Sequence, residues 1–239
     1  RAEKHGGGYR VSGQKVWIST AQVAEKVLLL ARADAGLTLF YTDLDRRHVE
    51  VREIDKMGRH AVDSNQVFFD ALPVPEEDRI GEEGKGFEYI LHGMNPERIL
   101  IAAELVGLGR CALARAAAYA TGRVVFGRPI GQNQAIQHPL ARNWMALEAA
   151  WLTTLSAAWE YDTGRPCGAA ANAAKYLAAE AGYEACERAV LTHGGMGYAK
   201  DFHVERYLRE VMIPRLAPVS QELVMCFIAE KVLGLPKSY

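Results

Sequence analysis

From residue 1 to about residue 86, apolar and polar positions alternate in short runs rich in valine, isoleucine and aromatic residues. Such runs, bounded by glycine and proline clusters, predict β-strands. The strands are expected at Val11–Ile18, Val27–Ala31, Leu37–Tyr41, Val49–Ile54 and Gln66–Phe69. Turn signals separate these runs, at Gly6–Gly8, Ser12–Gly13, Ala35–Gly36, Asp55–Gly58 and Pro73–Pro75. The glycine-rich residues 81–86 are typical of an exit loop.

After residue 86 the apolar spacing becomes that of amphipathic helices. The first helix is expected to begin with Asn95 as its N-cap and Pro96 as its first residue. Further helices are expected over Gln134–Tyr161, over Ala169–Leu191, after Asp201, and over Val219–Leu233. Long helices joined by short turns predict an up-down bundle. The chain is therefore expected to be α+β, with a β domain over residues 1–86 and a helical bundle domain over residues 87–239.

Three tryptophans, Trp144, Trp151 and Trp159, recur on one face of the second predicted helix. A stripe of large apolar side chains is most often core or a helix–helix interface. We favour that interpretation over any cofactor role.

Composition argues against several function classes. The 28 basic and 29 acidic side chains give a formal net charge of −1, which favours neither nucleic acid nor an anionic membrane as a partner. The longest apolar runs are too short to span a bilayer. The cysteines form no CxxC pair and the histidines no ligand spacing, so no metal site is predicted. Set among alanines and leucines, the cysteines fit buried, reduced thiols of an intracellular protein.

Four segments stand out in a fixed order: Lys15–Ser19, Asn95–Arg98, Arg123–Ile130 followed by Gln134, and His193–Tyr198. Each alone has an ordinary structural explanation. A strand tryptophan is most often core, a helix-terminal arginine meets free carbonyls, and glycines after a helix form a C-cap. The glycine segment is no dinucleotide fingerprint, because no strand precedes it. Together, however, the four segments resemble the acyl-CoA dehydrogenase family along essentially the whole chain.

This resemblance implies the fold and the cofactor. The β part resembles a partial β-barrel or sandwich, the family's middle domain, and the bundle resembles its C-terminal domain. The family binds FAD, with an indole packed on the flavin, a hydroxyl near its reactive nitrogen, and an arginine–aromatic–glutamine segment that reaches a neighbouring subunit's FAD. Glycines and a later glutamine contact the diphosphate and adenosine. The corresponding residues here are Trp17, Ser19, Arg123, Phe126, Gln134, Gly194, Gly195 and Gln221.

The resemblance leaves the catalytic base as the sharpest question. The family's commonest catalytic glutamate position is occupied by Ala217, which cannot do acid–base chemistry. A minority branch that includes isovaleryl-CoA dehydrogenase carries its base in a Glu-Arg-x-x-x-Ala segment, which matches Glu97–Ala102. Glu97 is therefore the candidate base, although the helix dipole alone favours glutamate in a first helical turn. Arg98 and Ala217 are assigned to the substrate side, with Arg98 pairing near the helix start and the Ala217 amide donating to the thioester carbonyl.

The function implied by the resemblance is α,β-dehydrogenation of an acyl-CoA, with hydride passing to FAD and electrons to electron-transfer flavoprotein. The alternatives are an acyl-CoA oxidase or flavin monooxygenase of the same fold, and a non-catalytic partner subunit. A homodimer or homotetramer in a bacterial cytoplasm or the mitochondrial matrix is expected. Because the chain starts Arg1-Ala2-Glu3-Lys4, it resembles a fragment, and we expect it alone to be a poor dehydrogenase.

Overall fold

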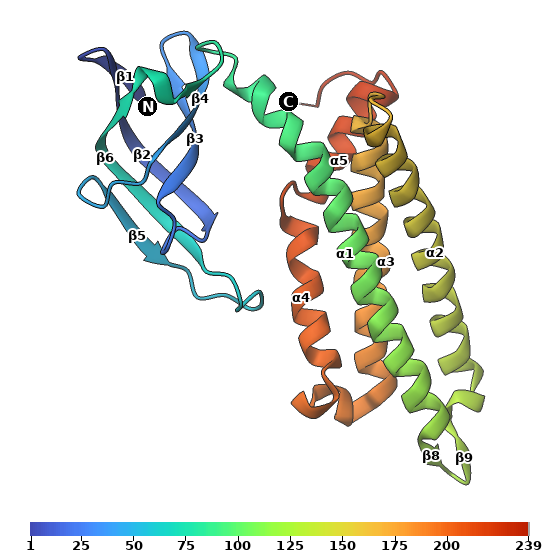
Figure 1. The fold of residues 1–239 in the computed structure, drawn as a ribbon. Helices are drawn as coiled ribbons and strands as arrows, with labels where there is room; N and C mark the ends of the chain where they lie inside the picture. The colour runs from blue at the N-terminus through green and yellow to red at the C-terminus, as the bar shows by residue number, and fades with distance from the viewer. Residues whose placement is uncertain (239) are drawn as a thin grey trace. The chain divides into compact units, whose positions relative to one another are not determined.

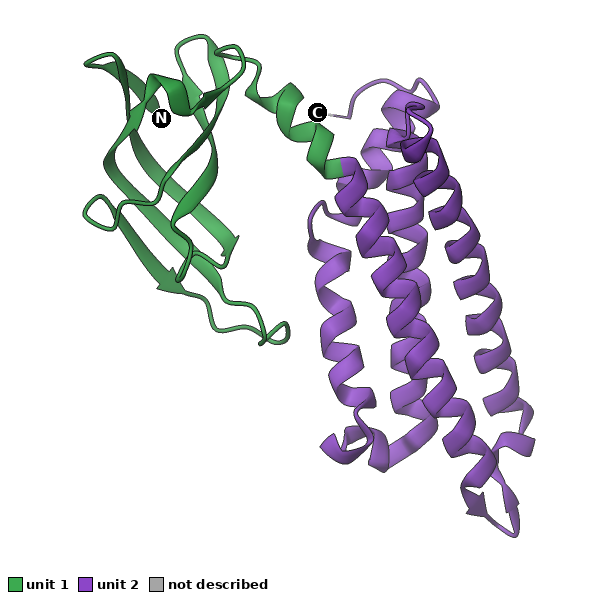
Figure 2. Cartoon of the chain, in the orientation of Figure 1, with its two compact units in different colours: residues 1–94 green, residues 95–239 purple. Residues whose placement is uncertain are grey.

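The computed structural model describes residues 1–238. Contacts within the chain define two compact units, Arg1–Met94 and Asn95–Tyr239, which Figure 2 distinguishes by colour. Each unit has its own hydrophobic core. Helix α1 (Gly86–Gly122) begins where the sequence predicts the second domain, and its first turns, up to Met94, group with the first unit.

The first unit consists of two antiparallel sheets (Figure 1). One has the order β1–β2–β6–β5, formed by Ala2–His5, Gly8–Ser19, Ser64–Pro75 and Val49–Glu53. The other has the order β3–β4–β7, formed by Lys26–Ala33, Gly36–Asp43 and Arg79–Ile80. Residues of both sheets share one core, in which the rings of Tyr9 and Phe40 meet edge to face at 4.9 Å. Neither sheet closes into a barrel within residues 1–238.

Two of the predicted turns are wrong, because the strands continue through them. β2 runs through Ser12–Gly13, where the register against β6 changes and the Ser12 hydroxyl accepts a 3.0 Å hydrogen bond from the Ala71 amide. β6 continues to Pro75, which pairs with Gly8. β5 pairs with β6 only at residues Asn65–Phe69. The edge of β6 that faces away from β2 therefore has no partner strand near its prolines, and no backbone N–H is needed there.

The second unit is an up-down bundle, as the sequence predicts. α1, α2 (Gln134–Asp162), α3 (Gly168–His193) and α4 (Val204–Leu216) lie alongside one another in alternating direction (Figure 1). A small hairpin, β8 (Val124–Val125) and β9 (Arg128–Pro129), joins α1 to α2. α4 is followed by the short helix α5 (Gln221–Phe227) and a π-helical turn, Ile228–Val232. Single 3-10 turns cover Glu76–Asp78, Ile130–Gln132, Gly194–Tyr198 and Lys200–Phe202.

Helix α3 lines the centre of the bundle with small side chains. Ala171, Ala174 and Ala178 recur at helical spacing and have an exposed fraction of 0%. A Cβ atom at Gly182 would lie 3.0 Å from the Leu105 carbonyl oxygen, so α1 and α3 pack closely there because Gly182 has no side chain. Lys175 interrupts this alanine face and is also fully buried, at 0%.

The predicted N-cap at Asn95 is wrong, because α1 begins at Gly86 and contains Pro96. Proline favours a helix start since it lacks an N–H, and inside a helix it loses its bond to the carbonyl one turn earlier and its ring crowds that carbonyl. The turns on both sides of Pro96 remain helical. Glu97 therefore lies well inside α1, and the helix-dipole explanation for a first-turn glutamate does not apply to it.

The tryptophan stripe is not part of the core of this chain. Trp144 is 57% exposed and Trp159 is 52% exposed, whereas Trp151 packs partly against the bundle core. The core interpretation is wrong for the first two residues because they lie on the outer face of α2. An interface with another helix stays a prediction for them.

The cysteines are only partly buried. Cys167 and Cys186 are buried among helices, as expected, but Cys111 is exposed and Cys226 is intermediate. The prediction of burial is wrong for Cys111, because alanines lie on both the inner and the outer face of α1 and do not show which face a neighbouring residue occupies. All four are free thiols.

One stretch, Val204–Val232, has the length and the mean hydropathy, 1.4, of a membrane-spanning segment. The structure divides it, since α4 ends at Leu216 and α5 begins only at Gln221. It is therefore no clear membrane span, although the sequence contains a longer apolar stretch than the short runs suggest.

Candidate functional site

Trp17 lies at a β-bulge near the end of β2. Val16 pairs with Gln66 and Ile18 with Asn65, so Trp17 is the extra residue without a partner of its own. Its φ of 63° lies in the left-handed region, which is rare for a bulky aromatic residue. The indole is 58% exposed, so the interpretation as a core tryptophan is wrong. Strained backbone that directs an aromatic ring outward is typical of a functional position.

Ser19, the last residue of β2, borders a hollow of about 500 Å³ within the first unit. Mostly apolar side chains line this hollow, among them Leu29, Val67 and Phe69. The Lys15 ammonium reaches its wall and donates a 2.7 Å hydrogen bond to the Leu30 carbonyl, and burial lowers the pKa of Lys15. The lining suits an apolar group better than a charged one.

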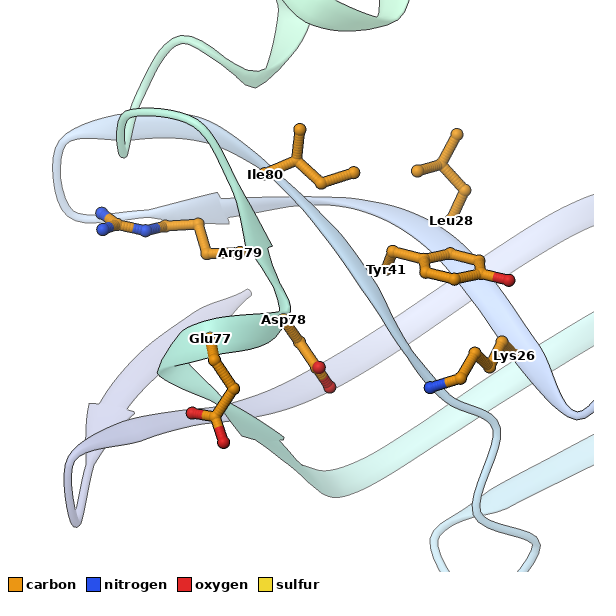
Figure 3. Close-up of a pocket in the computed structure, with 7 residues that line it drawn as sticks. All are labelled: Lys26, Leu28, Tyr41, Glu77, Asp78, Arg79 and Ile80. Atoms are coloured by element: carbon orange, nitrogen blue, oxygen red, sulfur yellow. The ribbon is translucent and has the colours of Figure 1, made fainter.

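A second depression, of about 520 Å³, lies on the sheet β3–β4–β7 (Figure 3). Its apolar part is formed by Leu28, Tyr41 and Ile80. The Lys26 ammonium lies 2.6 Å from an Asp43 carboxylate oxygen and 5.5 Å from the centre of the Tyr41 ring. The residues around the depression carry balanced charge and include none of the residues predicted from the sequence, so no role is assigned to it.

Glu97 and Arg98 lie side by side on α1. Glu97 is exposed, whereas Arg98 is only 8% exposed. One terminal guanidinium nitrogen of Arg98 donates a 3.0 Å hydrogen bond to Asn95 Oδ1, and its buried Nε has no partner within residues 1–238. Burial lowers the pKa of Arg98, and the nearby Glu97 carboxylate opposes this shift. Arg98 therefore pairs with an amide on its own helix rather than with a carboxylate.

The segment from Arg123 to Pro129 forms the β8–β9 hairpin at the end of α1. The Arg123 backbone N–H continues the helix with a 2.8 Å bond to the Tyr119 carbonyl, and the Arg123 carbonyl accepts a 2.9 Å bond from Ile130. Phe126 at the tip has a φ of 51° and is 100% exposed. Arg123 and Gln134 are also exposed. The hairpin thus presents a guanidinium, a ring and an amide to the outside of the unit.

Gly194 and Gly195 open the 3-10 turn that follows α3. Gly194 has φ 60° and ψ −135°, a conformation that is essentially restricted to glycine. No atom lies within 4 Å of the place where a Cβ would stand at either residue. The preceding His193 is buried and its ring stacks on Tyr119 at 4.2 Å, which fixes the turn. The backbone at both glycines is open to a close approach by a ligand.

The connection between α4 and α5, residues 217–220, contains Ala217 and leads directly into Gln221, the first residue of α5. The Ala217 amide donates a 2.9 Å hydrogen bond to the Ile213 carbonyl. Gln221 is buried, and its side-chain amide donates a 2.5 Å hydrogen bond to Glu180. A thioester carbonyl or a cofactor atom would share these donors with their present partners.

Lys175 is the residue that the sequence interpretation misses. It lies on α3 within the buried alanine face, and its ammonium donates a 2.6 Å hydrogen bond to the Val219 carbonyl in the connection. Burial first, and repulsion by Arg98 second, lower the pKa of Lys175 to about 8, while Glu222 opposes the shift. In the sequence, Lys175 lies four residues after Ala171 and three before Ala178, so it falls on the same helix face as these alanines. A charged residue on such a small, apolar face is the signal that could have identified it.

The structure places Trp17 and Ser19 in the first unit and all other predicted site residues in the second. Within the second unit, Arg98 of α1 repels the Lys175 ammonium of α3, and this ammonium donates a hydrogen bond to the Val219 carbonyl in the α4–α5 connection. No group of histidine, cysteine, aspartate and glutamate side chains in residues 1–238 is arranged to hold a metal ion.

Comparison with known families identifies the chain. Residues 1–72 match the acyl-CoA dehydrogenase middle domain, and residues 84–233 match the acyl-CoA dehydrogenase C-terminal domain. The chain belongs to the acyl-CoA dehydrogenase family. It is 38% identical over 246 residues to the acyl-CoA dehydrogenase fadE12 of Mycobacterium bovis. The aligned region covers 100% of this chain and 63% of that relative.

Two solved structures agree with the fold. The glutaryl-coenzyme A dehydrogenase glutaryl-CoA complex matches with a TM-score of 0.93 at 31% identity, over 99% of this chain and 62% of that one. The FAD complex of PigA matches with a TM-score of 0.93 at 25% identity, over 98% and 62%. The chain thus spans less than two thirds of the length of each of these relatives.

The residues expected at the family's FAD site fit a dinucleotide. Arg123 is exposed and has no ion pair among the described residues, so its guanidinium is available to a phosphate. Phe126 offers a fully exposed ring, and Gly194 and Gly195 offer open backbone. Gln221 fits less directly, because its amide nitrogen is already bonded to Glu180.

Proposed function

We propose that the complete protein is an FAD-dependent acyl-CoA dehydrogenase, which removes hydrogen from the α and β carbons of an acyl-CoA thioester. The observation that carries this proposal is the match of both family domains in order along the chain. The chain retains a carboxylate at Glu97, which compensates for the alanine at residue 217.

Glu97 is the proposed base. Its carboxylate is exposed on α1, so a substrate can reach it, and no ion pair within residues 1–238 occupies it. In the reaction Glu97 takes the α proton of the acyl group. FAD, when bound, supplies the acceptor for the β hydrogen as hydride.

The remaining residues orient the substrate and exclude water. When FAD is bound, the outward indole of Trp17 would pack against the flavin, and the Ser19 hydroxyl would donate a hydrogen bond near its reactive nitrogen. The Ala217 amide donates to the thioester carbonyl, sharing the proton that now bonds to Ile213. Arg98 supports this side of the site from within the bundle. The diphosphate and adenosine of FAD would be held by Arg123, Phe126, Gln134, Gly194, Gly195 and Gln221.

We propose that the protein is a homodimer or homotetramer. The tip of the hairpin at Phe126 is fully exposed, and α2 exposes Trp144 and, near its other end, Trp159. A second subunit that covers these side chains would also receive the Arg123 guanidinium at its FAD. We place the assembly in a bacterial cytoplasm or in the mitochondrial matrix.

The proposed electron acceptor is electron-transfer flavoprotein. An oxidase or monooxygenase of the same fold would pass electrons to oxygen instead. A non-catalytic partner subunit is the remaining candidate, and Ala217 favours it. The three candidates differ in the electron acceptor: electron-transfer flavoprotein for the dehydrogenase, oxygen for the oxidase or monooxygenase, and none for a non-catalytic subunit.

One assay of the complete protein separates the three functions. Purified protein is mixed with acyl-CoA substrates of varied chain length and branching, and reduction of an artificial dye is compared with release of peroxide. Dye reduction without peroxide supports the dehydrogenase. Peroxide release at a matching rate contradicts it in favour of an oxidase. Colourless protein without either activity contradicts any flavoenzyme.

A further inference from the structure

Two side chains of α3, Lys175 and Glu180, hold the α4–α5 connection at three points. Before the connection, Arg215 of α4 lies 3.0 Å from Glu180. Inside it, the Val219 carbonyl accepts the 2.6 Å bond from Lys175. After it, Gln221 donates its 2.5 Å bond to Glu180. We refer to Lys175 and Glu180 as the α3 clamp.

The charge of Lys175 is hard to explain by stability alone. The side chain is fully buried, and neither Lys175 nor the neighbouring Arg98 forms an ion pair within the described residues. Taking an ammonium out of water costs several kcal/mol, and a second cation nearby adds to that cost. An apolar side chain of similar length would fill the same space among alanines without this penalty.

What the ammonium provides is a charge-assisted hydrogen bond to one backbone carbonyl. Such bonds are shorter and stronger than neutral ones, and they fix the orientation of the peptide group they reach. The Val219 carbonyl belongs to the peptide that leads into Ser220, which is the N-cap of α5 and accepts a hydrogen bond from the Leu223 amide. Lys175 therefore fixes both the path of the connection and the start of α5.

We propose that Lys175 is a positioning residue: it holds the Val219 carbonyl so that the connection presents the Ala217 amide to an acyl thioester and Gln221 to the cofactor. This inference rests on the proposed function, because that function gives Ala217 and Gln221 their roles. Lys175 touches neither substrate nor cofactor. It acts through the backbone of the connection, and the same helix holds both flanks through Glu180.

The test compares Lys175→Met with wild type in the complete protein, with Lys175→Arg as the conservative variant. Lys200→Met, at an exposed lysine outside the site, is the matched control. Hydrogen–deuterium exchange of residues 216–223 is measured beside the melting temperature, kcat and KM. Lys175→Met is expected to exchange the Ala217 amide at least about tenfold faster and to lose about 10²-fold in kcat, with a smaller change in KM. Its melting temperature is expected to stay the same or rise, since a buried charge is removed.

Lys175→Arg is expected to recover part of the protection and of kcat, because it restores a cationic donor, and Lys200→Met is expected to match wild type. Wild-type exchange and kcat in Lys175→Met would overturn the proposal. Faster exchange throughout the bundle with a lower melting temperature would also overturn it, because Lys175 would then only support the fold. If wild type itself turns over no acyl-CoA, the proposed function fails, while the exchange of residues 216–223 still decides whether Lys175 holds the connection.

Discussion

Glu97 and Arg98 are consecutive residues of α1 that meet opposite environments: Glu97 is exposed, and Arg98 is 8% exposed. Successive helical residues are rotated by about 100° around the axis, so one of two neighbours can face outward while the other faces the bundle. The pair thus separates a carboxylate available to a ligand from a buried guanidinium that lowers the pKa of Lys175 on α3.

This separation predicts that substitutions of the two residues differ in their effect on stability. Glu97→Gln is expected to change the free energy of unfolding by less than about 0.5 kcal/mol, because an exposed side chain of the same size is replaced. Arg98→Ala is expected to cost about 1–3 kcal/mol, because it leaves a cavity and removes the partner of Asn95. Urea unfolding of the two variants checks this. A costly Glu97→Gln would contradict the exposed position of Glu97.

Arg123 should contribute to retention of FAD. Arg123→Ala removes a guanidinium that is free for a phosphate, so the Kd for FAD is expected to rise about tenfold to a hundredfold. Arg128→Ala is the matched control on the same hairpin, because its guanidinium is engaged by Asn133 at 2.7 Å. Titration of the apoprotein with FAD, followed by flavin fluorescence, gives both values. Equal affinities for wild type and Arg123→Ala would count against the cofactor assignment.

Lys175 should make stability depend on pH in the alkaline range. Its pKa falls from 10.5 to about 8 on folding. Between these values the unfolded chain binds a proton that the folded chain does not, so the free energy of unfolding rises with pH in this window. Wild type is expected to gain about 3 kcal/mol relative to Lys175→Met between pH 8 and pH 10.5. Parallel pH dependences of the two proteins would show that burial does not perturb Lys175.

The cysteines should differ sharply in reactivity. Cys111 is exposed, whereas Cys186 is buried and its pKa is raised to about 12 by burial and by the nearby Cys111. Iodoacetamide at neutral pH is expected to modify Cys111 in the folded protein and Cys186 only after unfolding, since the thiolate is the nucleophile. Peptide mass spectrometry reads out each site. Early modification of Cys186 would contradict the packing of α3.

The sequence predicts the strands and helices well where the spacing of apolar residues and the turn-forming residues at the ends of a segment agree. Alternation locates β3 and β4 within a few residues, and helical spacing with a final Gly164 locates α2. It fails at Pro96, because α1 continues through a proline that suits a helix start and normally kinks or breaks a helix interior. It fails at Pro73–Pro75, because an unpaired strand side accepts prolines that otherwise indicate a turn.

The predicted site residues come from a resemblance, and the structure adds the physical detail that motifs lack. The outward indole of Trp17 depends on a bulge that is visible only in the register of β2 against β6. The bond from Ala217 to Ile213 depends on how α4 ends. Lys175 lies far from every motif, and only packing brings its ammonium to the Val219 carbonyl.

The most direct test of the account is reduction of the bound flavin by acyl-CoA in the complete protein, without oxygen, in wild type and in Glu97→Gln. We expect wild-type flavin to bleach rapidly with a suitable acyl-CoA. Glu97→Gln is expected to hold the same amount of FAD with the same melting temperature, yet to lose at least about 10²-fold in the rate of bleaching, because the base is missing. Bleaching of Glu97→Gln at the wild-type rate would contradict the account, since the α proton would then leave to another group.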